Sequence, residues 1–132
     1  MNPAKLLSRH TLKNGLVLEF LDLSRPLVGD RWQVVVEARV AVAVSGDHLP
    51  ADLIPQLAQI IPVLGEEVVF TKQEVRQFVS ATEMAALLAE VQEQLLASLR
   101  NYLGHPEFAP RLIRKKYADL QEIKKLAAFR ES

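Results

Sequence analysis

The three histidines are the first residues to consider for chemistry, because imidazole is both a common metal ligand and a general base near neutral pH. His10, His48 and His105 are separated by 38 and 57 residues, so no two form the i, i+4 pair that places zinc ligands on one helix face. The acidic residues Asp47 and Glu66–Glu67 fall at predicted strand ends, where charged side chains normally stop sheet pairing. The sequence therefore predicts no catalytic and no metal-binding residue.

Nucleophilic and phosphate-binding motifs are also missing from the sequence. The chain has no Cys, which removes disulfides, thiolate nucleophiles and Cys-ligated zinc or iron–sulfur sites. It has only 5 Gly, and neither the G-x-x-x-x-G-K-[ST] and G-x-G-x-x-G phosphate loops nor the G-x-S-x-G serine elbow occurs. We therefore predict no cofactor.

A basic cluster near the C-terminus is the remaining candidate. Residues 111–132 carry 7 basic and 3 acidic side chains, a net of +4 in a chain whose overall formal charge is zero. Four basic residues are separated by 3, 4 and 14 positions and so share one side of a helix. They are Arg111, Arg114, Lys115 and Lys125, with Lys116 and Lys124 at the margins. Such a side can contact nucleic-acid phosphates or an anionic protein or membrane surface, and it is equally typical of the solvent side of a terminal helix.

Two long helices are predicted to carry and support this cluster. The first spans residues 81–103, begins at a Ser80–Glu83 capping box and ends before Gly104, which is expected to form a left-handed cap. The second runs from about Pro110 to Phe129. Because the link between them is short, we expect an antiparallel helical hairpin. Its facing residues would be Leu95 with Leu120, Val91 with Ile123, Leu88 with Leu126 or Ala127, and Glu90 with Lys124.

An antiparallel sheet is predicted to lie under these helices. Every second residue from Trp32 to Val44 is apolar, which is typical of a strand with one buried face. The pair Asn14-Gly15 favours a type I′ turn between strands at about 6–13 and 16–23. Segment 24–30 is predicted as a turn in which Ser24 bonds the backbone. A short helix beginning near Asp52 and a strand at 67–79 complete the sheet.

These elements predict one α+β domain over residues 1–132, with an antiparallel sheet of about four strands in the order β-β-β-α-β-α-α. Residues 1–79 would supply mainly strands with one short helix, and residues 80–132 the helical hairpin that covers one face. A chain of 132 residues can bury enough apolar surface to be stable without crosslinks. The N-terminal residues lack a signal peptide's apolar core, and no run approaches the roughly 18 apolar residues of a membrane span. A cytoplasmic protein is therefore expected.

The absence of a recognisable catalytic grouping favours a small non-enzymatic module that binds another protein or a second copy of itself. The long strand at 31–44 is expected to leave a free edge, and Val17, Leu21, Val35 and Ala41 an apolar far face. The alternative is nucleic-acid binding through the basic last helix. A third hypothesis is an enzyme with an unrecognised His/carboxylate site.

Overall fold

The computed structural model has an α+β fold with an antiparallel sheet, which confirms the predicted fold class. It describes residues 4–131, so residues 1–3 and 132, including the start of the segment considered above for a signal peptide, lie outside the description. The strands are β1 (Lys5–Thr11), β2 (Val17–Asp22), β3 (Arg25–Pro26), β4 (Arg31–Ala43) and β5 (Glu67–Ser80). The helices are the 3-10 turns η1 (Ala51–Gln56) and η2 (Ala81–Glu83) and the α-helices α1 (Leu57–Leu64), α2 (Met84–Leu103) and α3 (Phe108–Glu131).

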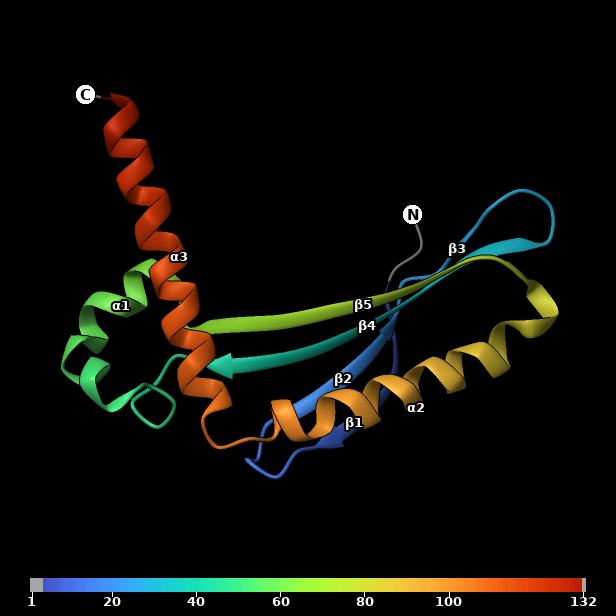
Figure 1. The fold of residues 1–132 in the computed structure, drawn as a ribbon, viewed down its shortest axis with the longest axis horizontal. Coiled ribbons are helices and arrows are strands. Elements are labelled where there is room, and N and C mark those ends of the chain that lie inside the picture. Colours follow the sequence, from blue (N-terminus) through green and yellow to red (C-terminus); the bar gives the residue numbers. More distant parts are fainter. Residues whose placement is uncertain (1–3, 132) are drawn as a thin grey trace. The chain divides into compact units, whose positions relative to one another are not determined.

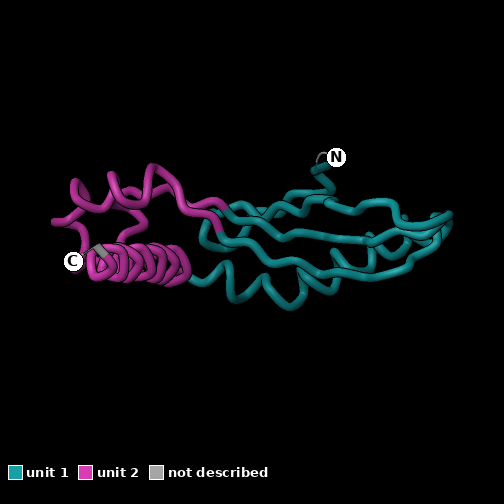
Figure 2. The backbone as a smooth tube through the Cα atoms, turned by 90° about the horizontal axis from the view of Figure 1, so that it is seen from above, with its two compact units in different colours: residues 1–40, 70–105 teal, residues 41–69, 106–132 magenta. Residues whose placement is uncertain are grey.

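The chain divides into two compact units, which Figure 2 colours separately. Unit 1 comprises residues 1–40 and 70–105, and unit 2 comprises residues 41–69 and 106–132. Each unit therefore draws on both the strand-rich segment 1–79 and the helical segment 80–132.

Strand β4 is the centre of the sheet. It pairs with β2 and β3 along one edge and with β5 along the other (Figure 1). The prediction that this strand leaves a free edge is therefore wrong, because β5 pairs with it. Segment 67–79, which forms β5, was correctly predicted to be a strand. The edge strands of the sheet are β1, β3 and β5.

One face of the unit 1 sheet is covered by α2. Antiparallel register places Leu18 opposite Val40 and Phe20 opposite Ala38, and all four side chains are fully buried. Helix α2 buries Val91, Leu95, Leu99 and Leu103. Ser8, which pairs with Phe20 across β1 and β2, donates to Gln92 of α2 at 2.7 Å. The apolar residues that alternate along β4 in the sequence therefore form the face on which α2 packs.

Strand β5 contains a β-bulge at Phe78. The bonds from the Val44 amide to the Glu66 carbonyl and from the Ala81 amide to the Asp30 carbonyl mark the two ends of the β4–β5 ladder. Counted inward from these ends, β5 has one residue more than β4. Phe78 has a positive φ of 55° and is 69% exposed, while Val79 is buried. The extra residue thus turns Val79 inward and leaves the Phe78 ring outside.

The turn at Asn14-Gly15 joins β1 and β2 as predicted, but its type differs. Only Gly15 has a positive φ, at 87°, and its amide bonds the Leu12 carbonyl at 2.9 Å. This geometry is a type I turn followed by a glycine bulge, not the predicted type I′ turn.

The amide side chain of Asn14 explains the choice of turn, because it caps the C-terminus of α2. Its Nδ2 donates to the carbonyls of Leu103 at 2.8 Å and His105 at 3.1 Å, which would otherwise lack helical partners. Gly104 has φ −87°, so the predicted left-handed cap is wrong. A Cβ on Gly104 would lie 2.9 Å from the Arg100 carbonyl and 3.4 Å from the Lys13 amide. Glycine is needed there for the close approach of the turn to the helix end.

The start of α2 also differs from the prediction. The segment 81–103 is helical throughout, but its first three residues form the 3-10 turn η2. Ser80 makes no capping bond, and its hydroxyl contacts that of Thr82 at 3.2 Å. The Ala81 amide, at the start of this turn, bonds the Asp30 carbonyl.

The third helix α3 contacts α1 within unit 2. Its first turns bury Phe108, Ala109, Leu112 and Ile113. By contrast, Ile123 and Leu126 are 59% and 54% exposed. The predicted hairpin would cover these two side chains with α2, which belongs to unit 1, and it stays a prediction.

We expect Val36→Asp to prevent folding, because Val36 is completely buried on the face of β4 that α2 covers. An unpaired buried carboxylate costs several kcal/mol, comparable to the total stability of about 5–15 kcal/mol of a small protein. Val75→Asp on β5, where the side chain is 41% exposed, is the matched control and should melt close to the parent. Circular dichroism during heating measures both, and a cooperatively melting Val36→Asp protein would refute the burial of this face.

We expect Asn14→Ala to lower the free energy of unfolding by about 1–2 kcal/mol, because two carbonyls at the end of α2 lose their donor. Lys13→Ala, at the neighbouring exposed position of the same turn, should change it by less than about 0.5 kcal/mol. Urea denaturation of the three proteins measures the difference. Equal midpoints for the two variants would show that the cap does not stabilise unit 1.

Candidate functional site

His10 and His48 contact uncharged groups near their own elements. His10 on β1 packs edge-on against Phe20 with ring centroids 5.6 Å apart, and its Nε2 lies 3.2 Å from the Ser8 hydroxyl. The Nδ1 of His48 lies 2.8 Å from the Ala43 carbonyl and so carries the proton in this contact. These contacts hold loops and strands together.

Ser8 and His10 resemble the first two members of a catalytic triad, but their hydrogen bonds run in the wrong direction. The single Ser8 hydroxyl proton is donated to the Gln92 Oε1 at 2.7 Å. The Nε2 of His10 must then donate to the Ser8 oxygen, whereas a general base has to accept from it. This arrangement therefore fixes β1 against α2 and does not activate the serine.

Between residues 4 and 131 no group of three or more His, Asp or Glu side chains is placed to hold a metal ion. No described helix combines the length and the apolarity needed to cross a membrane.

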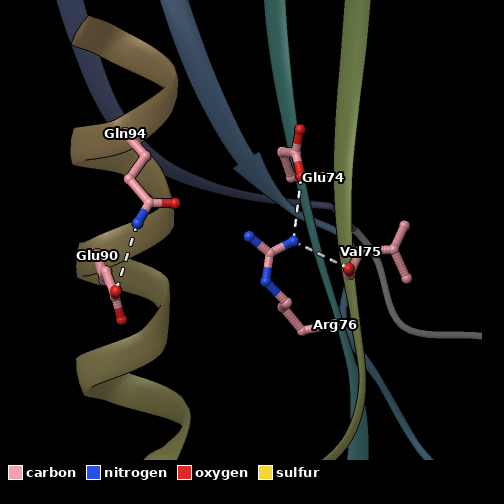
Figure 3. A network of polar contacts seen from close by, with 5 residues as sticks. All are labelled: Glu74, Val75, Arg76, Glu90 and Gln94. Atoms are coloured by element: carbon pink, nitrogen blue, oxygen red, sulfur yellow. Dashed lines mark hydrogen bonds and ion pairs between the residues drawn. The ribbon is translucent and has the colours of Figure 1, made fainter. Parts of the chain in front are cut away.

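A shallow groove of about 370 Å³ lies between β5 and α2. Figure 3 shows Arg76 beside it, donating to the Glu74 carboxylate and to the Val75 carbonyl, each at 3.1 Å. On the facing helix Gln94 donates to Glu90 at 3.3 Å. Acidic and basic groups thus alternate along this edge strand and neutralise one another. Such charges protect a sheet edge from pairing with another strand, and they leave no net field to attract a charged ligand.

The four basic residues predicted as an anion-binding side are all exposed on α3, but they are not equivalent. Arg114 donates to both carboxylate oxygens of Asp52, at 2.6 and 3.2 Å, in a two-pronged ion pair within unit 2. These bonds hold the pKa of the Asp52 carboxyl below its usual value and raise the pKa of Arg114. The charge of Arg114 is therefore compensated, and the uncompensated cations of the predicted set are Arg111, Lys115 and Lys125.

The C-terminal half of α3 is a helical segment without a buried side. All residues from 121 to 130 are exposed, although the helix continues through them. Two of the exposed residues are Ile123 and Leu126. They continue the apolar sector that is buried further back at Leu112 and Ile113. We name residues 119–130 the distal segment of α3.

The comparisons find nothing similar. No protein-family model, no curated protein and no solved structure matches this chain. A function must therefore be argued from its own surfaces.

The distal segment combines apolar side chains with charges of both signs, which suits contact with another protein helix. The sequence contains this signal as an apolar stripe in the last helix, and the predicted hairpin gives that stripe an intramolecular partner. The sequence pattern identifies an apolar side and does not identify what covers it.

We expect the pKa of Asp52 to be lower in the parent than in Arg114→Gln, because the guanidinium stabilises the charged carboxylate. A lowered folded-state pKa means that the pair contributes at neutral pH and is lost as the pH falls through that pKa, below the ordinary value of 3.8. NMR titration of the carboxyl carbon measures this shift. Arg111→Gln, on the same helix, is the control and should leave the titration unchanged; the same pKa in all three proteins would exclude the pair in solution.

Proposed function

We propose that this protein is a small non-enzymatic interaction module whose contact element is the distal segment of α3. The single observation that supports this proposal is the exposure of Ile123 and Leu126, at 59% and 54%, on a helix whose preceding turns are buried. A protein partner that covered the same sector would continue the packing that unit 2 begins.

Helix stability gives a physical reason for such a partner. Isolated helices shorter than about 12–15 residues are marginal in water, and most helices in proteins are stabilised by packing of an apolar side. Within unit 2, residues 121–130 are all exposed and no described residue of this unit covers them. Binding that buries Ile123 and Leu126 would therefore stabilise the helix and remove apolar surface from water in one step.

Nucleic-acid binding through the basic side of α3 is supported less well. Arg114 is already paired with Asp52, so one of the four predicted cations is compensated. The remaining cations share the helix with Asp119 and Glu122. A phosphate-tracking surface normally requires several uncompensated cations, because its affinity comes from displaced counterions.

Site-specific photo-crosslinking in the cells that make the protein tests this proposal. A benzophenone side chain at position 127 lies on the apolar sector, and the same group at position 121 lies on the opposite side as the matched control. We expect a covalent adduct with a protein from position 127 and little from position 121. Mass spectrometry of the adduct gives the partner's identity.

Two results would contradict the proposal. One is the absence of any protein adduct at position 127. The other is an adduct with DNA or RNA at position 115 that disappears when Arg111, Arg114 and Lys125 are replaced together by Gln, which would make the basic side the functional surface.

A further inference from the structure

We propose that the partner of the distal segment is the same segment of a second copy of this chain, docked antiparallel, with Asp119 of each copy facing Arg130 of the other. This inference rests on the proposed function and specifies its partner. It is carried by the spacing of apolar and charged residues on α3.

Four residues of the distal segment form one seam along the helix. Asp119, Ile123, Leu126 and Arg130 are spaced by 4, 3 and 4 positions, the alternation that keeps side chains on the contact line between two packed helices. The inner two residues are apolar. The outer two carry opposite charges, one at each end.

The order of the seam is self-complementary when two copies run in opposite directions. Residues at the same height on antiparallel helices have numbers with a constant sum. If Asp119 faces Arg130, that same sum makes Ile123 face Leu126. Under two-fold symmetry each contact occurs twice, so the interface would contain two ion pairs around two apolar pairs.

A parallel arrangement is disfavoured by the same charges. It would place Asp119 beside Asp119 and Arg130 beside Arg130 of the second copy, and like charges at an interface are destabilising. The charges therefore favour the antiparallel direction of the two helices. The contact between Ile123 and Leu126 provides the attraction between the two copies.

Neither charged residue of the seam, Asp119 or Arg130, takes part in an ion pair between described residues. The two residues are 11 positions apart, about 16 Å along a helix, and so cannot contact each other in one copy. Any coupling between them must be intermolecular.

The expected dimer is weak because the seam is short. Leu112, seven residues before the first residue of the seam, is already buried, so the second copy can cover only the last three turns of α3. An interface of this length is smaller than a standard stable one. We therefore expect a reversible dimer in the micromolar range.

Sedimentation equilibrium of the purified full chain with a charge-reversal cycle tests the inference. Asp119→Arg and Arg130→Asp should each raise the dissociation constant about tenfold, because two attractive contacts become repulsive. The double variant should return to within about threefold of the parent, since both contacts reform with exchanged signs. Lys125→Glu, a charge reversal on the opposite side of the helix, is the control and should leave the constant within about twofold. Circular dichroism checks that each variant stays folded.

Three results would overturn the inference: a parent that stays monomeric up to millimolar concentration, a double variant as weak as the single ones, or a Lys125→Glu variant weakened as much as Arg130→Asp. If a monomeric parent is found together with a crosslink from position 127 to a different protein, the self-association is wrong and the proposed interaction function remains. If position 127 gives no protein adduct at all, both are wrong.

Discussion

The structure depends on β4, which is buried on both faces over residues 34–38 and pairs with β2 and β3 along one edge and with β5 along the other. Residues 34–38 are all buried in succession, although the sequence pattern predicts burial of every second one. The face away from α2 includes Glu37, whose carboxylate accepts from Arg39 at 3.2 Å and from Gln73 on β5 at 3.1 Å. A buried carboxylate is tolerated only with such partners. The same strand therefore requires α2 on one face, polar partners on the other, and β5 along the edge that β2 and β3 leave unpaired.

Most of the sheet could be predicted because strand formation is encoded in neighbouring residues. The alternation from Trp32 to Val44 and the Asn14-Gly15 turn specify strands and their order, and segment 67–79 is a strand as expected. The turn type, the bulge at Phe78 and the cap at Gly104 could not be read in this way. Each is determined by a contact between segments far apart in the chain, such as the bond from Asn14 to the Leu103 carbonyl.

Helix α3 shows why the exposure of the candidate site could not be predicted from the sequence either. Ile113 and Ile123 lie in one apolar sector of one helix, and the periodicity treats them alike. In the structure Ile113 is fully buried and Ile123 is mainly exposed. The difference arises from how much chain is available to cover α3 in unit 2, which is a property of the tertiary fold. An exposed apolar surface such as that at Ile123 can be identified only when the contacts within the chain are known.

The path of the chain through unit 1 has a consequence for folding during synthesis. Unit 1 consists of residues 1–40 and 70–105, so β1 to β3 and most of β4 are made long before β5 and α2, which complete their core. The Asn14 amide can bond the Leu103 carbonyl only after Leu103, 89 positions later in the sequence, has been synthesised. Contacts of such long sequence separation slow folding, because the intervening chain must be ordered before they form. The apolar face of β2 and β4 therefore stays open on the ribosome until α2 has emerged, which makes the order of translation itself a risk for aggregation.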